Sequence, residues 1–490
     1  MSERPNILCI VTDQHRGDCI GADPHAPTDA DGRSLVHTPN IDSFVRKGAM
    51  FTRAYTPAPS CIPARRSLLT GQTPYTNGAP GWVTTPWEFE HTLPQELRDA
   101  GYQTRLTGKI HSLPIRNHVG FESMDQHEAL HAHPDDDYAR WLEQETDGQC
   151  DELSHGLGRN SWDSRPWHLE EYQHPTNWTT RRAIEFLDQR DDTRPFFLNL
   201  SYVRPHTPFD PPQVYWDMYV DRDTPKPYMG DWIDDEHGEK IPDYPGISAW
   251  VADLPPTVVH RARAAYYGLI THIDHQIKRV LEKLRLNGER ENTFVVFLSD
   301  HGEMLGDHHM WRKTYAYEGS ARVPLLFRFP DSMELPQAQL IDRPVGLEDV
   351  MPTLLSVAGV DVPDAVEGRN LLDLVRDPDR EDWREWYHGE HAAGSYDPEN
   401  GTQYLVDGRF KYVWNPVTDS ELLFDLAHNP GEERDLSSEA EHASDLERAR
   451  ITMIDRLAGR PEGFVEDGTL VSTDAGPGDI GDPDDCSSDS

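Results

Sequence analysis

The segment around Cys61 combines residue types that suit a nucleophile or an anion-binding site. Cys61 stands two residues before Pro63, and the run that follows ends at Gly71. Pro is well tolerated in a first helical turn because its missing N–H would have no partner there, and Gly is typical of a helix end. The pattern therefore predicts a helix that begins at Cys61. The backbone N–H groups and the dipole of such a helix favour negative charge beside the cysteine.

Two Asp-containing pairs add candidate metal ligands. Asp13-Gln14 and Asp300-His301 each follow a run of apolar, β-branched residues that predicts a buried parallel strand. Two carboxylates and an amide oxygen suit a hard divalent cation such as Ca²⁺, Mg²⁺ or Mn²⁺. Taken singly, each pair also fits an ordinary turn. Because both pairs follow strands and Cys61 lies between them in the sequence, the set favours a metal site.

Two lysines and two histidines extend this set. Lys is scarce, because only 8 of the 46 basic residues are Lys and the others are Arg. Lys109 and Lys313 therefore indicate positions that need a compact point charge. His111 lies two residues after Lys109, on the same side of an extended segment, and His206 lies in a proline-rich turn. A lone Lys or loop His is commonly a surface residue, but the neighbouring motifs favour a role at the site.

An α/β fold would bring these residues together. Apolar runs that end in polar side chains alternate with helical patterns, which indicates a doubly wound, mostly parallel sheet. The ligand crevice of such a sheet lies at the carboxyl ends of its strands. Residues 117–174 are polar and weakly periodic, so we expect an insertion over the site. The predicted strands are 6–12, 102–107, 194–203 and 293–298, and the predicted helices are 38–48, 61–71, 91–100, 177–189, 258–286 and 345–357.

The C-terminal part has a different pattern. Residues 385–425 show short alternating runs around an Asp407-Gly408 turn, which predicts a small antiparallel sheet. A final helix is predicted over residues 438–457. The end of the chain is rich in Gly, Pro, Asp and Ser, a composition typical of disorder. We therefore expect a catalytic domain over 1–360, a C-terminal subdomain over 361–460 and a disordered acidic tail over 461–490.

Composition and charge exclude several classes of partner. The chain has 490 residues, with 46 basic and 86 acidic side chains and a formal net charge of −40, which argues against nucleic acid or an anionic membrane as a partner. With so little Lys, this surface favours a halophilic protein of a high-salt cytoplasm, and an acidic mesophilic enzyme with a disordered tail is the alternative. Five scattered Cys without a CxxC pair make a disulfide framework or structural zinc site unexpected. Neither a secretory signal nor a long apolar span is evident, so we expect a cytoplasmic protein.

The motif Cys61-x-Pro63-x-Arg65 resembles the signature of the type I sulfatases of the alkaline phosphatase superfamily. The resemblance covers about residues 4–425, and the other motifs follow in the family's order. These motifs are Pro5 to Asp13, Gly108-Lys109-x-His111, His206 to Phe209, Ser299 to Gly302, and Tyr317 to Pro324.

This resemblance implies an alkaline-phosphatase-like fold and the hydrolysis of sulfate esters. It implies that a formylglycine-generating system oxidises Cys61 to formylglycine, whose hydrate provides the nucleophilic hydroxyl. A thiol fits a hard cation poorly, so Cys61 is better interpreted as a precursor than as the reagent. The resemblance also implies one divalent metal held by Asp13, Gln14, Asp300 and His301 together with the modified Cys61. Calcium is the first choice, with manganese or magnesium as alternatives.

The resemblance assigns catalytic roles as well. Arg65 would hold the formylglycine, Lys109 and Lys313 would neutralise the sulfate oxygens, and Asp300 would act as base. His206 would protonate the leaving alcohol, and His111 would assist the release of sulfate.

Two departures from the commonest family pattern keep alternatives open. The pairs Asp13-Gln14 and Asp300-His301 resemble the branch that contains choline sulfatases and phosphonate monoester hydrolases. Hydrolysis of a phosphonate monoester or phosphodiester at the same site is therefore one alternative. A non-catalytic metal-binding protein with an unmodified Cys61 is another. The substrate alcohol, whether sugar, aryl or alkyl, is not indicated by these motifs.

Overall fold

A central sheet of eight strands organises the protein, whose structure is a computed structural model describing residues 4–83, 85–128, 134–233, 246, 249–394 and 399–473. The strands are β1 Asn6–Asp13, β2 Gly48–Phe51, β4 Gln103–Gly108, β5 Ser123–Gln126, β6 Phe196–Pro205, β7 Thr293–Ser299, β8 Leu325–Arg328 and β9 Gln339–Ile341. Their spatial order is β5-β4-β6-β1-β7-β8-β2-β9. The first five run parallel, whereas β8 is antiparallel to both of its neighbours. The predicted α/β fold with a mostly parallel sheet is confirmed.

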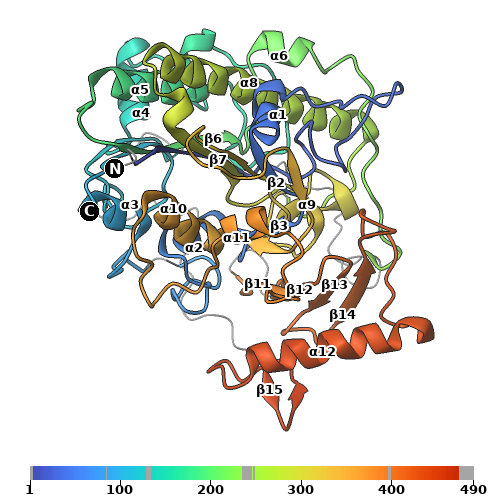
Figure 1. Ribbon diagram of the computed structural model, residues 1–490. Helices are drawn as coiled ribbons and strands as arrows, with labels where there is room; N and C mark the ends of the chain where they lie inside the picture. The colour runs from blue at the N-terminus through green and yellow to red at the C-terminus, as the bar shows by residue number, and fades with distance from the viewer. Residues whose placement is uncertain are drawn as a thin grey trace.

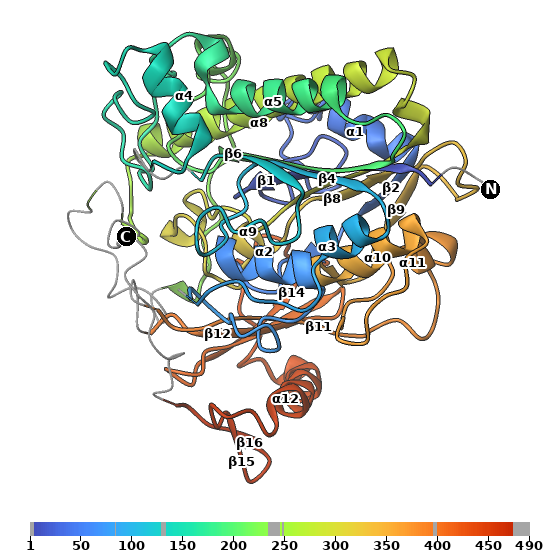
Figure 2. The ribbon, with the colours of Figure 1, turned by 90° about the vertical axis from the view of Figure 1, so that its left-hand side faces the viewer.

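Helices cover both faces of this sheet (Figures 1 and 2). One layer contains α1 Pro39–Arg46, α5 Pro175–Gln189 and α8 Pro256–Leu286, with α4 Asp137–Glu145 and α6 Gln213–Asp217 packed nearby. The other layer contains α2 Cys61–Thr70, α3 Leu93–Asp99, α10 Val350–Ala358 and α11 Leu372–Arg376.

The apolar character of the central strands follows from this double cover. Every residue of β1 is buried. Ile7, Cys9 and Val11 pack in one core cluster, and Leu8 and Ile10 pack in the other, on the opposite face. Successive side chains of a strand point to opposite faces, so an unbroken apolar run serves two cores at once.

A second, antiparallel sheet is built from the C-terminal part of the chain. Its strands are β11 Tyr387–His391, β12 Thr402–Val406, β13 Phe410–Trp414 and β14 Glu421–Asp425, in that spatial order. The turn between β12 and β13 is the predicted one, with the Asp407 N–H donating to the Phe410 carbonyl at 3.1 Å. Helix α12, Ala443–Leu457, packs on the outer face of this sheet, and the inner face packs on the main body.

Several local expectations differ from the structure. The segment 117–174 contains β5, an edge strand of the main sheet, and α4. An edge strand needs no continuous apolar run, which is why the short, polar β5 gave no signal. The helix predicted from residue 345 begins at Val350, because Val345–Gly346 forms strand β10, paired with β3, Ala54–Tyr55. A short helix, α9, spans Glu318–Ala321.

A short β-hairpin follows α12, in a part of the chain that we expected to be disordered. Residues 461–473, which composition placed in the tail, contain the hairpin of β15 Val465–Glu466 and β16 Thr469–Leu470. Phe464 is buried there against Trp414. The remainder of the predicted tail, 474–490, lies outside the described residues. The division of the chain near residue 360 stays a prediction. Within the described ranges, no helix is both long and apolar enough to cross a membrane.

Candidate active site

Four neighbouring parallel strands deliver the predicted residues to one edge of the sheet. In spatial order these strands are β4, β6, β1 and β7. Lys109 directly follows β4, His206 follows β6, Asp13 is the last residue of β1, and Asp300 follows β7. Thr12 on β1 pairs with Ser299 on β7, so the residues that follow them, Asp13 and Asp300, lie side by side. The expectation that these motifs meet at the carboxyl ends of the strands is confirmed.

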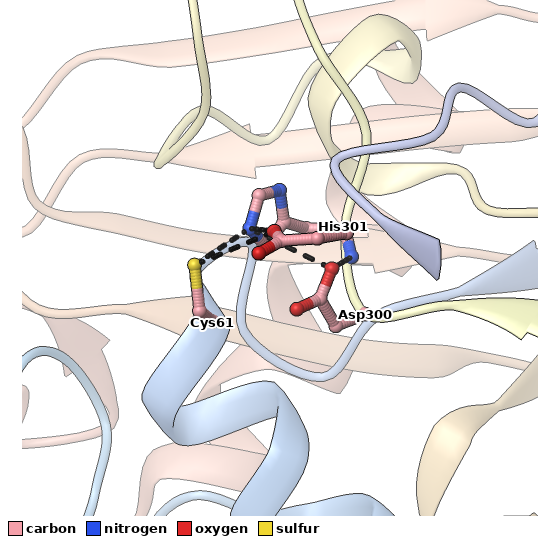
Figure 3. A group of neighbouring side chains, drawn as sticks. Cys61, Asp300 and His301 are labelled. Atoms are coloured by element: carbon pink, nitrogen blue, oxygen red, sulfur yellow. Dashed lines mark hydrogen bonds and ion pairs between the residues drawn. The ribbon is translucent and has the colours of Figure 1, made fainter. Parts of the chain in front are cut away.

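Helix α2 begins at Cys61, as predicted (Figure 3). Ser60 precedes it in an extended conformation, and Gly71 ends it in the left-handed conformation with a φ of 66°. Cys61 is 1% exposed, so the sulfur lies in the interior at the start of the helix. Figure 3 shows the sulfur pointing toward His301, with Asp300 beside it.

Four side chains form a compact group that can hold a cation. Asp13, Cys61, Asp300 and His301 each offer a ligand atom, and these atoms all lie within 4.8 Å of one another. The Cys61 sulfur is 3.2 Å from Nε2 of His301 and 3.7 Å from Oδ1 of Asp13. All four residues are buried. Gln14, the fifth predicted ligand, follows Asp13 with a φ of 67°, and its Oε1 accepts a hydrogen bond from Lys313 Nζ, which also donates to the Cys61 sulfur.

Two lysines and an arginine surround this acidic group. Lys109 Nζ lies 2.5 Å from Oδ2 of Asp13. Lys313 Nζ donates to the Cys61 sulfur at 3.1 Å and to Oε1 of Gln14 at 3.0 Å. Nε2 of His206 lies 3.0 Å from the same ammonium. A compact ammonium can reach several partners at once, which fits the choice of Lys in an Arg-rich chain.

Arg65 connects α2 to residues at the ends of β4 and β7 and to a residue of β6. Its Nε donates to Oδ2 of Asp300 at 2.8 Å, and its Nη1 donates to the carbonyl of Lys109 and to Oγ of Ser201, both at 2.9 Å. Because Arg65 lies one turn after Cys61 on α2, these bonds fix the position of the helix start.

The charges of this group shift the pKa values of its members. Burial and the Asp13 carboxylate oppose ionisation of Cys61, but Lys109, Lys313 and His301 lower the pKa of the thiol to about 6. Burial also opposes ionisation of Asp13, yet Lys109 and other cations hold the pKa of Asp13 well below its usual range.

Asp300 behaves in the opposite way. Burial, and then the neighbouring Asp13, raise the pKa of Asp300, although Arg65 opposes the change. Two buried carboxylates within 4.8 Å of each other repel, and a divalent cation between them would relieve that repulsion. Carboxylate oxygens with an imidazole nitrogen are ordinary ligands for such an ion. The residues present therefore fit a divalent cation.

The two predicted histidines outside the acidic group are held neutral. Burial, followed by the charge of Lys313, keeps the pKa of His206 well below its usual value. Burial, followed by the charge of Lys109, lowers the pKa of His111 to about 3. His111 contacts the edge of Trp82, and its backbone N–H is bound by Glu128 at 2.9 Å.

Sequence patterns missed three supporting side chains. Glu303 accepts a hydrogen bond from Nε2 of Gln14. Ser201 on β6 binds Arg65, and Glu128 binds the backbone before and at His111. Glu303 directly follows the motif Ser299 to Gly302, so its position next to that motif was a usable signal. Glu128 lies in the segment that we expected to be irregular, so no local signal marked it.

The fold and the site define an alkaline-phosphatase-like α/β hydrolase with a buried group of side chains that can hold a divalent cation. The family model for sulfatases matches residues 5–360, and the model for the C-terminal region of N-sulphoglucosamine sulphohydrolase matches residues 306–457. The chain belongs to the sulfatase family. It is a hydrolase of sulfate esters, and the family implies a divalent metal and a formylglycine.

Individual relatives agree with this assignment. The chain is 40% identical over 487 residues to an arylsulfatase of Clostridium perfringens, with 96% of this chain and 97% of that protein aligned. It is 30% identical to a choline-sulfatase of Rhizobium meliloti, with 96% of this chain and 85% of that protein aligned. The crystal structure of a phosphonate monoester hydrolase of Agrobacterium radiobacter superposes with a TM-score of 0.78 at 25% identity, covering 92% and 95% of the two chains.

Proposed function

We propose that this sulfatase cleaves the sulfate monoester of a small alcohol at the Cys61 site. The observation that carries the proposal is the meeting of Cys61 with Asp13 and Asp300 between the ammonium groups of Lys109 and Lys313. A sulfate ester is a tetrahedral anion, and preorganised cationic groups in a water-poor site stabilise the charge that develops as it reacts.

Asp13, Asp300 and His301, with Gln14 close by, would hold the cation. A bound divalent cation supplies Lewis-acid charge neutralisation, and a formylglycine at position 61 supplies the nucleophilic hydroxyl. We propose calcium first because carboxylate and amide oxygens dominate the donor set, with manganese or magnesium as alternatives. A formylglycine-generating system is then a required partner of the chain.

The remaining residues bind and orient the ester. Lys109 and Lys313 neutralise the sulfate oxygens, and Arg65 holds the start of α2 against Asp300. Asp300, whose pKa is raised by burial and by Asp13, is the candidate proton acceptor at the nucleophile.

His206 is the candidate proton donor to the leaving alcohol. Its Nδ1 lies 2.8 Å from the carbonyl of Thr207, so the ring is fixed by its own loop. Its Nε2 lies 3.0 Å from Lys313 Nζ, which can supply a proton to that nitrogen. His111, two residues after Lys109, is the candidate for assisting the later step in which sulfate is released.

Hydrolysis of a phosphonate monoester or phosphodiester is the second candidate, and the structural similarity to a phosphonate monoester hydrolase favours keeping it. Rates on 4-nitrophenyl sulfate and on bis(4-nitrophenyl) phosphate separate the two reactions because the leaving group is the same. We expect the sulfate to be the faster substrate. A preference for the phosphodiester by orders of magnitude would reverse the assignment.

Mass spectrometry of the peptide that contains residue 61 tests the nucleophile directly. We expect the aldehyde or its hydrate in protein made in its own host. An unmodified thiol together with no turnover of either ester would instead support a non-catalytic metal-binding protein.

We also propose that the chain works in a high-salt cytoplasm, without nucleic acid or membrane partners. The net charge of −40 supports this proposal, because salt screens the repulsion between acidic groups.

A further inference from the structure

Strand β11 presents a histidine to the side of the main body that carries the site. Side chains alternate along a strand, so Tyr387 and His391 share one face. Tyr387 stacks on Tyr55 of the main body, with ring centroids 6.0 Å apart. His391 therefore faces the main body as well. His388, on the opposite face, forms a hydrogen bond with Oε1 of Gln403 at 2.8 Å.

The end of β11 is bound to the two segments that flank the start of α2. The Glu390 N–H donates to the carbonyl of Pro57 at 2.9 Å, just before α2. The Ala392 N–H donates to the carbonyl of Pro80 at 2.8 Å, just before Trp82. In Figure 2 the C-terminal sheet lies directly below α2. These bonds place the histidine of β11 against the segments that precede and follow α2, the helix that begins at Cys61.

Buried polar atoms without partners gather on this side of the centre. His391 is 4% exposed, and neither ring nitrogen makes a hydrogen bond of normal geometry within the described part of the chain, although the Ala392 backbone lies close enough to influence the ring. Nε1 of Trp82 and Nδ1 of His111 are also buried without a hydrogen-bond partner among the described residues. The two rings pack edge to face, with their centroids 5.6 Å apart. Trp82 also packs in the cluster of Ile62, next to Cys61. Buried polar groups are normally paired, so such a set beside a reactive centre indicates a ligand.

We propose that His391 and Trp82 bind the alcohol part of the substrate, and that this alcohol is a hydroxyl-bearing ring such as a sugar. The proposal rests on the sulfatase function proposed above and selects among its possible alcohols. A neutral imidazole offers one donor and one acceptor, which matches a hydroxyl group that both donates and accepts. The indole adds a donor and an apolar face for the ring carbons.

The charge state of His391 agrees with an uncharged ligand group. Burial lowers the pKa of His391 to about 4, with the Ala392 backbone opposing the change and the charge of His301 adding to it. The ring is thus neutral at pH 7 and attracts no second anion. A quaternary ammonium group would be recognised by aromatic faces and carboxylates, and would leave these nitrogens unpaired.

The test compares two variants on two classes of substrate. His391→Phe keeps the ring and its burial but removes both nitrogens, and His388→Phe makes the same change on the opposite face of β11. The substrates are 4-nitrophenyl sulfate and a panel of glucose, galactose and N-acetylglucosamine monosulfates. We expect His391→Phe to lower kcat/KM for the best sugar sulfate about 10- to 100-fold, which corresponds to one or two lost hydrogen bonds. The aryl sulfate should change less than about 3-fold, and His388→Phe should leave the ratio of the two substrates unchanged.

Other outcomes overturn the proposal. An equal loss on both substrate classes would assign His391 to folding or to the sulfate itself, and no loss on either would remove it from the site. A wild-type enzyme that cleaves the aryl sulfate but no sugar sulfate would refute the substrate class while the sulfatase function stands. An enzyme that cleaves neither sulfate would refute both.

A measurement without turnover makes the test independent of the modification of Cys61. Saturation-transfer NMR can detect the free monosaccharides of the panel on a Cys61→Ala protein. We expect a transfer signal for the sugar of the preferred substrate. That signal should disappear in Cys61→Ala/His391→Phe and persist in Cys61→Ala/His388→Phe. Its persistence without His391 would refute the contact.

Discussion

The loop that carries His206 is closed at its base by a buried ion pair, and breaking this pair should change the chemistry in a specific way. Arg204 donates from Nε and Nη2 to the two carboxylate oxygens of Asp210 at 2.8 and 2.9 Å. Arg204 is 1% exposed and Asp210 is fully buried. Asp210 also lies 3.3 Å from Nε2 of His155. Because the pair joins the two ends of the loop, Asp210 is a positioning residue for His206.

Asp210→Asn removes the charge and keeps the shape of the side chain. Removing one partner of a buried ion pair costs about 3–5 kcal/mol, and we expect the lower end of this range because Glu152 still neutralises Arg204. For 490 residues the unfolding entropy is roughly 1 kcal/mol per kelvin, so the thermal midpoint should fall by about 3–5 °C. Burial opposes ionisation of Asp210, but Arg204 holds its pKa well below the usual value. The stabilisation is therefore complete above pH about 4 and is lost as the pH falls through the lower folded-state pKa.

The catalytic readout is the dependence on the leaving group. A proton donor contributes about 10²- to 10⁴-fold when the leaving alcohol is poor, and little when it is 4-nitrophenolate. Asp210→Asn should displace His206 without removing it, so part of the rate contribution of the proton donor should remain. We therefore expect kcat/KM on an alkyl sulfate to fall about 10- to 100-fold. On 4-nitrophenyl sulfate the loss should be less than about 3-fold.

A matched control separates position from stability. Asp349 is fully buried and pairs with Arg384 through both oxygens at 2.6 Å, without contacting the site residues described above. Asp349→Asn should lower the thermal midpoint by a similar amount and reduce both substrates equally. If Asp210→Asn also reduced both substrates equally, the argument that Asp210 acts through His206 would be refuted.

Three further perturbations follow from the structure. Gly108→Ala should prevent folding, because a Cβ there would lie 1.8 Å from the Ser201 carbonyl oxygen. Gly101→Ala has a similar positive φ but open space around it, so it should cost only about 1–2 kcal/mol. Urea titration of the two variants compares their free energies of unfolding. Chelation with EDTA should abolish hydrolysis and lower the thermal midpoint, and calcium should restore both better than magnesium; full activity in EDTA would contradict the metal site. Raising KCl from about 0.1 M to about 2 M should raise the thermal midpoint, since screening shortens the range of the repulsion, and calorimetry showing no change would contradict a high-salt adaptation.

The sequence allowed the strand-end motifs to be predicted because their signals are local. A buried strand is recognised by an unbroken apolar run, and the polar residues that follow β1, β4, β6 and β7 must then meet at one edge. The start of α2 at Cys61 followed in the same way from Pro63 and Gly71. Each of these inferences needs only a few consecutive residues and one rule of sheet topology.

Contacts between distant segments could not be predicted. Glu128 binds the backbone at His111 from the segment just after β5, a strand too short and polar to give a signal. Asp210 resembles any loop aspartate until its burial and its partner are known. The inward direction of His391 depends on the register between β11 and β12, which pairs it with Thr402. Such registers are set by packing across the whole fold, so a local pattern cannot specify them.

A third lysine, Lys411, is buried between the C-terminal sheet and the main body. Lys411 on β13 is fully buried, and its Nζ lies 2.7 Å from Glu318 and 2.8 Å from Glu432. It also donates to the carbonyl of Ala316, three residues after Lys313. A compact ammonium thus joins the C-terminal sheet to the loop that carries Lys313. The same sheet carries His391, so it both supports the loop of Lys313 and supplies a residue of the proposed alcohol site. We expect Lys411, like Lys109 and Lys313, to depend on the compact charge of Lys, in its case to support the site.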